Sequence, residues 1–422
     1  MRLVSTRSAA VQSDFMAAVQ AGLAPDGGLF VPAKVPRFAG VPELLAVDFQ
    51  TRSTEILHRL LGDEIPRAEL GSLVRRAFTF PAPVVPVGGP LSALELWHGP
   101  TLAFKDFGAR FLAQVLSRVA AGRRCTVLTA TSGDTGAAVA QAFWGLPGVQ
   151  VVVLYPKGRV SPLQERQFAT CGGNVLALAV EGAFDDCQRL VKAAFEDAAL
   201  VAKLGLTSAN SINIARLLAQ TLYYFEAAAQ IDDRRPLVVA VPSGNFGNLY
   251  AGLLAQRMGA PIARFVVATN ANRAVPEYLD TGEYRPRPSV ASLSNAMDVG
   301  APSNWERIHA LFGGDHGAMA AALRWGSRTD AETRETLVAL QGLGYLADPH
   351  GAVACGVLQV QLREGEQGLF LATAHPAKFR EVLESVLGRK IPLPRALGDL
   401  AGKPLLYEPL AADAAALKRR LL

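Results

Sequence analysis

The sequence predicts an open α/β fold in which mostly parallel strands are covered by helices on both faces. Short runs rich in β-branched residues alternate along the chain with segments of amphipathic, helical period. These runs are continuously apolar, as expected for parallel strands buried on both faces of a sheet. They begin at Cys125 (CTVLTA), Val149 (VQVVVLY), Asn174 (NVLALAV), Pro236 (PLVVAV), Arg264 (RFVVATN) and Gly368 (GLFLATA).

The length and the order of patterns predict more than one domain. A chain of 422 residues is longer than a single hydrophobic core usually grows. Its first part mixes short helical patterns with joints rich in Pro and Gly, and ends in PAPVVPVGGP, from Pro81 to Pro90. The alternation of strands and helices begins after this stretch. We therefore expect an N-terminal domain over residues 1–90 and an α/β region over residues 91–422.

Composition excludes several classes of protein. The formal net charge is +5, but Lys and Arg are spread along the chain without a basic run, which argues against nucleic-acid binding. The four cysteines lie far apart with no C-x-x-C pair, which favours free thiols over a disulfide framework or a metal site. No stretch has the length of a membrane span, and the N-terminus lacks the apolar region of a signal peptide. We expect a cytoplasmic protein.

Three loops lie between a predicted strand and a predicted helix, where open α/β sheets bind ligands. They are SGDTG (Ser132 to Gly136), SGNFG (Ser243 to Gly247) and the segment from Thr373 to Pro376. Small residues let a backbone approach a ligand closely, and SGNFG is typical of a phosphate cradle built from backbone N–H groups and a helix dipole. An ordinary turn would explain any one loop alone, whereas three together favour a site.

Common nucleotide and hydrolase motifs are absent from the sequence. It contains no G-x-G-x-x-G, no G-x-x-x-x-G-K-[ST], no H-E-x-x-H and no G-x-S-x-G. An enzyme that uses a nicotinamide cofactor or ATP is therefore disfavoured.

Lys105 is the strongest candidate for a reactive side chain. It follows an extended segment containing Pro100, opens a predicted helix, and lies between Phe104 and Phe107. A surface lysine that extends to solvent is the alternative interpretation. Desolvation and the positive end of a helix would both lower its pKa and leave a neutral amine that can attack a carbonyl. Lys105 is thus a candidate for an imine-forming lysine.

Seven segments together resemble the threonine synthase family, in its bacterial and fungal subgroup. They are GLAPDGGLFVP, HGPTLAFKDF, TATSGDTGAA, SANSIN, PSGNFGN, ASLSNAMDVG and TAHPAKF, which cover nearly the whole chain in the family's order. The resemblance implies a type II pyridoxal-phosphate fold, in which two open, mostly parallel α/β domains enclose the cofactor behind an N-terminal domain. It also implies pyridoxal 5'-phosphate as cofactor, O-phosphohomoserine and water as substrates, and L-threonine and phosphate as products of a β,γ-replacement. We expect a monomer or a homodimer.

The resemblance also assigns cofactor-binding residues. Lys105 would bind the cofactor covalently and then act as acid and base. Thr373 would meet the pyridine nitrogen, and Asp134 stands where many relatives of this fold carry an Asn beside the phenolic oxygen. The cofactor phosphate would be held by Ser243, Gly244, Asn245, Phe246 and Gly247.

Substrate-binding residues follow from the same resemblance. The pattern N-S-x-N-x-x-R implies a pocket for the substrate phosphate, formed by Asn210, Ser211, Asn213 and Arg216, with Asn248, Ser132 and Thr135 as further substrate-binding residues. If a helix begins near Ser211, Asn210 and Ser211 would cap it and Arg216 would reach back to the same end. From this segment alone, a plain helix cap followed by a solvated arginine is an equal alternative.

Other readings remain open from the sequence. His98 and His350 could act as acids, but a lone histidine in such a loop more often has a structural role. A serine or threonine dehydratase is the nearest alternative enzyme, and a cofactor-binding protein without catalysis is the alternative from another class. The motif S-T-R at Ser5 to Arg7 is expected to be structural or to form a lid.

Overall fold

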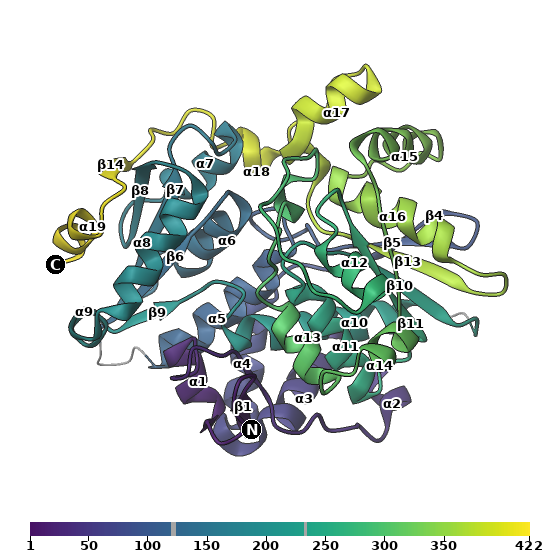
Figure 1. The fold of residues 1–422 in the computed structure, drawn as a ribbon, viewed down its shortest axis with the longest axis horizontal. Coiled ribbons are helices and arrows are strands. Elements are labelled where there is room, and N and C mark those ends of the chain that lie inside the picture. Colours follow the sequence, from purple (N-terminus) through teal and green to yellow (C-terminus); the bar gives the residue numbers. More distant parts are fainter. Residues whose placement is uncertain (120–123, 232–233) are drawn as a thin grey trace.

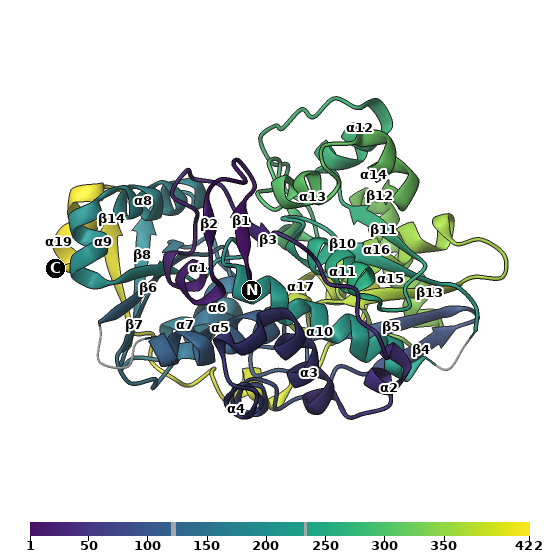
Figure 2. The same ribbon diagram turned by 90° about the horizontal axis from the view of Figure 1, so that it is seen from below.

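The computed structural model describes residues 1–119, 124–231 and 234–422, which form three sheets surrounded by helices (Figure 1). A three-stranded antiparallel sheet near the N-terminus has the order β2-β1-β3, and Figure 2 shows it between the two larger sheets. The strands are β1 (Leu3–Ser5), β2 (Gln12–Ser13), β3 (Phe30–Pro32), β4 (Val84–Gly88), β5 (Leu91–Glu95), β6 (Cys125–Ala130), β7 (Val149–Pro156), β8 (Val175–Glu181), β9 (Leu206–Ser208), β10 (Leu237–Pro242), β11 (Arg264–Thr269), β12 (Leu323–Ser327), β13 (Gln367–Ala372) and β14 (Tyr407–Ala411).

Helices make up most of the remaining structure. The α-helices are α1 (Phe15–Ala21), α2 (Val41–Leu45), α3 (Phe49–Leu61), α4 (Arg67–Ala77), α5 (Lys105–Val119), α6 (Asp134–Phe143), α7 (Pro162–Ala169), α8 (Phe184–Glu196), α9 (Ala198–Leu204), α10 (Ile214–Gln230), α11 (Gly247–Met258), α12 (Ala274–Thr281), α13 (Trp305–Leu311), α14 (His316–Ala322), α15 (Asp330–Gly342), α16 (Pro349–Gln361), α17 (Arg380–Leu387), α18 (Arg395–Gly398) and α19 (Ala414–Leu421). Three short 3-10 helices are η1 (Gly62–Glu64), η2 (Asn295–Met297) and η3 (Pro376–Phe379). Among the described residues, no helix combines the length and apolarity needed to cross a membrane.

All six predicted runs form parallel strands, so the predicted α/β fold is confirmed. β6, β7 and β8 pair with one another in a five-stranded sheet of order β14-β8-β7-β6-β9. β10, β11 and β13 form the centre of a six-stranded sheet of order β12-β11-β10-β13-β5-β4. Its edge strand β4 is antiparallel to β5. β4 lies before the predicted domain boundary at residue 90, yet it belongs to the sheet of the α/β region. The division of the chain at residue 90 stays a prediction.

Alternation of side chains explains why both faces of the five-stranded sheet are apolar. Successive residues of a strand point to opposite faces. On one face the strand residues share a hydrophobic cluster with α8, α9 and α19; these residues are Leu128, Ala130, Val152, Leu154, Leu178 and Val180. Their sequence neighbours lie in the main core with α5, α6 and α7; these include Val127, Val151, Val153, Ala177 and Ala179. A strand with two buried faces must be continuously apolar, as the sequence shows.

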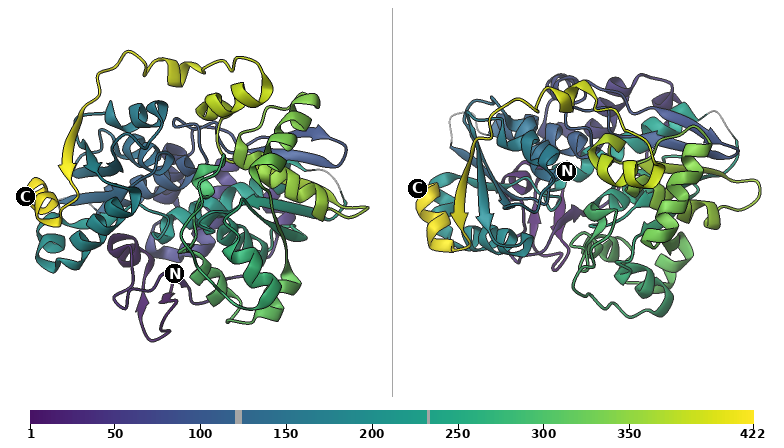
Figure 3. Two further views of the ribbon diagram at one scale, coloured as in Figure 1. Left: turned by 45° about the horizontal axis from the view of Figure 1, so that its top comes forward. Right: turned by 90° about the horizontal axis from the view of Figure 1, so that it is seen from above.

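The chain passes between the two larger sheets more than once. β5 lies in the six-stranded sheet, β6 to β9 form most of the five-stranded sheet, and β10 returns to the first. After α17 the chain crosses over the molecule, and β14 pairs with β8 (Figure 3). Loops from the carboxyl ends of both sheets therefore face one shared region, which is where open α/β folds bind ligands.

Candidate active site

The segment before α5 pairs with the segment after β13. Ala103 and Ala374 form an isolated antiparallel bridge, and the backbone N–H of Phe104 donates to the carbonyl of Thr373 at 2.9 Å. The N–H of His375 donates in turn to the carbonyl of Leu102 at 3.0 Å. These bonds place the start of α5 beside Thr373, so two residues assigned to the cofactor by resemblance lie together.

Lys105 begins α5, as predicted, and is largely buried. Its side chain is 17% exposed. The pKa of Lys105 is lowered to about 8, chiefly by burial; the charge of Asp134 opposes the shift, and those of Lys378 and Arg216 add to it. This position agrees with the expectation of an amine that loses its proton near neutral pH, and it contradicts the alternative of a solvated surface lysine.

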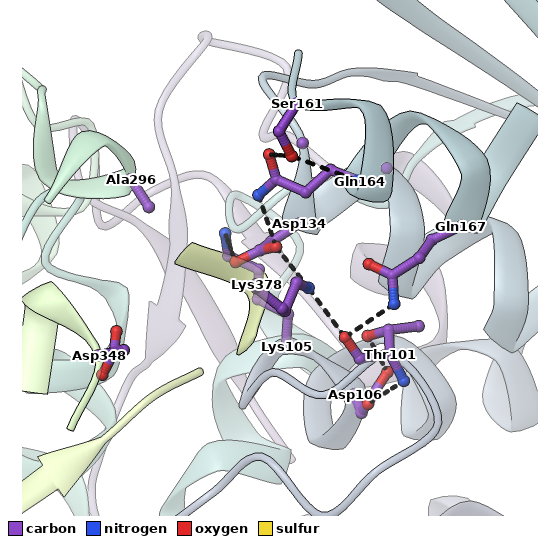
Figure 4. A network of polar contacts seen from close by, with 12 residues as sticks. Thr101, Lys105, Asp106, Asp134, Ser161, Gln164, Gln167, Ala296, Asp348 and Lys378 are labelled. Carbon is purple, nitrogen blue, oxygen red and sulfur yellow. Dashed lines mark hydrogen bonds and ion pairs between the residues drawn. The ribbon is translucent and has the colours of Figure 1, made fainter. Parts of the chain in front are cut away.

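Asp134 is the first residue of α6, which begins three residues earlier than the loop from Ser132 to Gly136 predicted, so Asp134 is part of the helix rather than the loop. One carboxylate oxygen lies 2.6 Å from Nζ of Lys378 and accepts a hydrogen bond from Gln164 at 2.9 Å, and the other lies 3.9 Å from Nζ of Lys105 (Figure 4). Burial alone would raise the pKa of Asp134, but both lysine charges and these hydrogen bonds hold it well below its usual range. The carboxylate is therefore ionised.

Lys378 was missed by sequence reasoning. It lies in η3, within the TAHPAKF segment, and its side chain is fully buried. The sequence does contain a feature that points to a buried lysine. Lys378 lies between apolar neighbours, with Pro376 and Ala377 before it and Phe379 after it, as Lys105 does. A buried lysine needs a partner, and the sequence alone did not reveal that Asp134 was available.

The glycine-rich loop after β10 offers free backbone donors at the start of α11. Within the described residues, the N–H groups of Gly244 to Gly247 donate no hydrogen bond to the protein. Phe246 adopts a left-handed conformation (φ 62°), which turns the chain into the helix. Free N–H groups at a helix N-terminus suit a phosphate, so the loop fits the cofactor phosphate that the resemblance places there.

Ser243 takes a different role from the one predicted. Its N–H donates to the carbonyl of Ala268 at 2.8 Å, and its hydroxyl donates to the carbonyl of Val241 at 2.9 Å. Both donors are therefore used inside the protein. Ser243 shapes the loop, which corrects its predicted place among the phosphate donors.

The SNAMD segment packs directly on the glycine-rich loop. A Cβ atom on Gly244 would lie 2.7 Å from Cα of Met297 and 2.9 Å from the carbonyl oxygen of Ala296. Only glycine fits at position 244.

The N–H of Ala296 donates to Nε2 of His350 at 3.2 Å, and Nδ1 of His350 lies 2.6 Å from a carboxylate oxygen of Asp348. His350 has the structural role that the sequence favoured.

A second loop, before α10, is joined to the glycine-rich loop. The side-chain amide of Asn245 donates to the hydroxyl of Ser211 at 2.8 Å, and that of Asn304 donates to the same oxygen at 3.2 Å. A hydroxyl that accepts two hydrogen bonds can still donate its proton. Asn210 accepts a hydrogen bond from the hydroxyl of Thr129, at the end of β6. The structure thus brings Asn210, Ser211 and Asn245 together.

The predicted N-cap of α10 was wrong. α10 begins at Ile214, and its N-cap is Asn213 rather than Asn210 or Ser211. The N–H of Asn213 donates to the carbonyl of Asn210 at 3.1 Å, so a turn separates the two residues before the helix starts. Sequence spacing cannot distinguish this turn from a first helical turn.

Asn213 is also wrong as a predicted ligand of the substrate phosphate. Its side chain is fully buried, and its amide donates to the carbonyls of Val19 at 2.9 Å and Ser208 at 3.1 Å. Its oxygen caps the helix by accepting from the N–H of Ala215. No donor is left for a phosphate.

Arg216 and Asn248 both carry a buried donor without a partner. Arg216 is 3% exposed, and Nη1 donates to the carbonyl of Ala209 at 2.7 Å, while Nε has no partner. The oxygen of Asn248 accepts from the hydroxyls of Tyr223 and Tyr224, while its Nδ2 has no partner. Unpartnered buried donors are costly and suggest a bound acceptor. The alternative of a solvated arginine at position 216 is therefore wrong.

Close packing of α5 against α10 keeps Arg216 near Lys105. A Cβ atom on Gly108 would lie 2.9 Å from the carbonyl oxygen of Arg216 and 3.2 Å from its Cβ atom. Gly108 lies three residues after Lys105 on α5. The absence of a side chain there lets the arginine's backbone approach the helix that carries the amine.

Arg307 is a second residue that the sequence did not reveal. It is fully buried on α13, and it donates to the carbonyls of Ser211 at 3.1 Å, Ile212 at 2.6 Å and Phe30 at 3.0 Å. It therefore fixes the loop before α10 against strand β3. The neighbouring Glu306 accepts a hydrogen bond from Thr6, so the S-T-R motif contacts the same helix, and its role as a structural or lid-forming segment stays a prediction.

The hydroxyl groups of the remaining predicted residues are free of protein partners in the part of the chain that the structure describes. Ser132 is exposed and Thr135 half-buried, and Thr373 is 7% exposed. His98 lies 2.8 Å from a carboxylate oxygen of Glu95 and stacks on Trp97.

The arrangement combines one low-pKa amine with two sets of donors suited to anions. The first set is the backbone of residues 244–247, and the second includes Arg216, Asn248 and Ser211. A covalently held phosphate cofactor fits the first set and Lys105, because a neutral amine forms an imine and free N–H groups hold a phosphate. The second set has donors without a protein partner, Nε of Arg216 and Nδ2 of Asn248, that could bind a separate anion.

Comparison with known proteins identifies the family. Residues 81–373 match the family of pyridoxal-phosphate dependent enzymes, residues 2–78 match the threonine synthase N terminus, and residues 351–420 match the threonine synthase C-terminal family. The threonine synthase of Escherichia coli (strain K12) is 52% identical over 426 residues, which cover 100% of this chain and 99% of that protein. That of Haemophilus influenzae is 52% identical over 424 residues, covering 100% of both chains.

Solved structures agree with the sequence comparison. The crystal structure of threonine synthase from Escherichia coli superposes with a TM-score of 0.94 and covers 100% of this chain and 99% of its own. PLP-bound threonine synthase from Brucella melitensis, 36% identical, superposes with a TM-score of 0.95 and covers 100% and 98%. The expected type II pyridoxal-phosphate fold and the expected cofactor are confirmed. The chain belongs to the threonine synthase family of pyridoxal-phosphate-dependent enzymes.

Proposed function

We propose that this chain converts O-phosphohomoserine and water into L-threonine and phosphate by a β,γ-replacement. The single observation that carries this substrate is the second set of unpartnered buried donors, at Arg216 and Asn248. The glycine-rich loop already accounts for one phosphate, that of the cofactor. A further set of donors beside the same amine suits a substrate that carries a phosphate of its own.

Lys105 is the residue that would move protons. With a pKa of about 8, its amine is partly neutral at neutral pH and can both accept and return a proton. We assign to it the covalent attachment of the cofactor, the removal of the protons at Cα and Cβ of the substrate, and the return of one proton at Cγ after phosphate has left. The hydroxyl group of a water molecule then adds at Cβ, its other proton balances the charge of the released phosphate, and Lys105 returns the second proton at Cα. When bound, the cofactor supplies the electron sink for these proton transfers.

Other residues would hold the cofactor in place. The N–H groups of Gly244 to Gly247 would bind its phosphate at the start of α11. The hydroxyl of Thr373, which is free of protein partners among the described residues, would meet the pyridine nitrogen. Asp134 is the residue that the resemblance places by the phenolic oxygen.

The leaving phosphate would be held by the second set of donors. Arg216 offers Nε, Asn248 offers Nδ2 and Ser211 offers its hydroxyl proton, with Asn210 beside them. Charge builds up on the phosphate oxygens as the bond to Cγ breaks, and donors already in position stabilise that charge. Ser132 and Thr135, at the open side of the region, remain proposed contacts to the substrate.

The dehydratase alternative has no use for a second phosphate site. Serine and threonine carry a carboxylate, an amine and a hydroxyl group but no phosphate, whereas the donors at Arg216 and Asn248 are additional to the glycine-rich loop. A protein that binds the cofactor without catalysis would also need the Lys105 amine and the glycine-rich loop, but it would have no use for the further donors at Arg216 and Asn248. We propose further that the protein acts as a monomer or homodimer in the cytoplasm, where its four free thiols would remain reduced.

Incubation of the purified holoenzyme with O-phosphohomoserine tests the proposal. We expect phosphate and threonine in equal amounts, and neither product from unphosphorylated homoserine at a comparable rate. Parallel incubations with serine and threonine, followed by an assay for oxo acids, test the dehydratase alternative. Rapid oxo-acid formation without phosphate release from O-phosphohomoserine would overturn the proposed function.

A further inference from the structure

Two lysines converge on a single carboxylate inside the site (Figure 4). Lys378 is fully buried; its Nζ lies 2.6 Å from Oδ1 of Asp134 and donates to the carbonyl oxygen of Thr101 at 2.8 Å. Lys105 approaches Oδ2 of the same carboxylate only to 3.9 Å. A distance of 2.6 Å is a direct, charge-assisted hydrogen bond, whereas 3.9 Å is beyond hydrogen-bond length. Asp134 is thus bonded to Lys378 and only near Lys105.

The environment of Asp134 strengthens this choice of partner. The side-chain amide of Gln164 donates to the same Oδ1 atom at 2.9 Å, so two donors fix the carboxylate in one orientation. Asp134 also lies at the N-terminus of α6, where the helix dipole favours a negative charge. A buried carboxylate that lost Lys378 would keep its charge only by finding another cation, and Lys105 is the nearest.

We propose that Lys378 is a positioning residue that takes Asp134 as its own partner, so that the Lys105 amine has no directly bonded carboxylate and stays free to react. This inference deepens the proposed function and rests on Lys105 as the amine that binds the cofactor. A direct bond between Lys105 and Asp134 would favour the protonated amine and turn it towards α6, and a protonated amine cannot attack a carbonyl.

The charges that face Lys105 determine whether loss of Lys378 raises or lowers the pH at which Lys105 loses its proton. They come from three elements: Asp134 on α6, Lys378 on η3 and Arg216 on α10. The carboxylate favours the protonated amine and the two cations oppose it. Removing the charge of Lys378 takes away one opposing cation and also releases Asp134 to pair with Lys105. Both consequences stabilise the protonated amine, so the pH at which Lys105 loses its proton must rise.

A purely structural role for Lys378 is the alternative. The carbonyl of Thr101, which Lys378 contacts, also accepts from Gln167 at 3.1 Å, and the Thr101 N–H and hydroxyl donate to Asp106 at 2.8 and 2.7 Å. Lys378 therefore also anchors the loop that leads into α5. If this anchoring were its whole role, its removal would lower stability or rate without changing the titration of Lys105.

The test uses the full-length chain freed of cofactor. The rate of imine formation with added pyridoxal 5'-phosphate is followed by absorbance as a function of pH, which reports the fraction of neutral Lys105. For the wild type we expect half-maximal rate near pH 8. For Lys378→Met we expect this pH to rise by about one unit or more, the range expected when an opposite charge comes within contact distance. Lys418→Met is the matched control, because Lys418 also lies 2.6 Å from a carboxylate, that of Asp197, but on the surface.

A double variant separates the electrostatic role from anchoring. Asp134→Asn combined with Lys378→Met removes one charge of each sign, so the half-maximal pH should return towards that of the wild type. This variant also lacks the uncompensated carboxylate that could prevent Lys378→Met from folding, and Asp134→Asn alone should lower the half-maximal pH. The inference is overturned if these variants share the wild-type half-maximal pH. If borohydride instead fixes the cofactor on a lysine other than Lys105, the proposed function itself fails.

Discussion

The side-chain amide of Asn245 donates a 2.8 Å hydrogen bond to the hydroxyl of Ser211, so the loop after β10 is bonded to the loop before α10. The oxygen of Asn245 also accepts from the N–H and hydroxyl of Ser303. One side chain therefore connects the proposed cradle for the cofactor phosphate with the proposed pocket for the substrate phosphate. If both proposed anion sites are used, their geometry is coupled through Asn245.

Asn245→Ala should therefore weaken both sites together. A hydrogen bond of this kind contributes roughly 1 kcal/mol, so we expect cofactor affinity and kcat/KM each to fall by about fivefold. Cofactor titration and steady-state kinetics measure the two effects. Asn174→Ala is the control, because Asn174 also joins two segments: it donates to the carbonyl of Phe143, at the end of α6 opposite Asp134, and to that of Val149, at the start of β7. A variant in which only one of the two quantities changed would contradict this coupling.

Lys105 should carry the cofactor. Borohydride reduction of the holoenzyme should fix the pyridoxyl group on the peptide containing Lys105, which peptide mass spectrometry identifies. Lys105→Ala should fold, because a partly exposed amine at the edge of the site adds little packing, and it should have almost no turnover. Modification of another lysine would refute the assignment.

Gly244→Ala should weaken cofactor binding. The new methyl group would meet the backbone of Ala296 and Met297 at less than van der Waals distance, so the loop must move and its N–H groups would leave their positions. We expect a loss of at least about tenfold in cofactor affinity, measured by fluorescence titration. Gly398→Ala is the control, because a Cβ atom there has no neighbour within 4 Å. Equal affinities for the two variants would argue against the cradle.

Arg216→Ala should impair the phosphorylated substrate selectively. A charge-assisted contact to the leaving phosphate contributes about 3 kcal/mol, so kcat/KM for O-phosphohomoserine should fall by about a hundredfold or more. The spectrum of the bound cofactor should stay nearly unchanged, and the pH at which Lys105 loses its proton should rise only slightly, because the Arg216 charge is the smallest of the contributions to its pKa. Arg216→Lys should recover only part of the loss, because an ammonium cannot reproduce the forked geometry of a guanidinium.

Arg264→Ala serves as the control for this prediction. Arg264 also donates to a backbone carbonyl, that of Ala321 at 2.6 Å, but lies on β11 away from the site. Its removal should affect stability without changing kcat/KM. If Arg216→Ala retained wild-type efficiency, the pocket for the substrate phosphate would lie elsewhere and the dehydratase alternative would gain support.

The cysteines should react slowly in the folded protein. Burial raises the pKa of Cys125 and Cys171 to about 11, and that of Cys187 and Cys355 to about 12. Since the thiolate is the reactive form, a raised pKa means that little of it exists at pH 8. Alkylation with iodoacetamide should be slow at pH 8 and should become rapid after unfolding in urea. Rapid alkylation of the native protein at pH 8 would show that the thiols are accessible and ionised.

The sequence by itself determined six of the parallel strands, the glycine-rich loops and the candidate lysine, Lys105. Continuous apolar runs of β-branched residues can be buried only between two layers of helices, so their pattern alone specified β6, β7, β8, β10, β11 and β13. Lys105 could be found because its aromatic neighbours and its place at a helix start are local features. Each of these inferences depends on residues that are adjacent in the chain.

The tertiary structure alone decided which side chains meet. The pairing of Lys378 with Asp134 and the position of Arg307 between Phe30 and Ser211 join segments that are far apart in the sequence. The position of Asn213 as helix cap, instead of phosphate ligand, depended on a turn that residue spacing does not encode. Burial makes an unpartnered charge or amide costly, so such residues find partners wherever the packed chain provides them. Local pattern can identify a buried polar residue, but only the packed fold determines its partner.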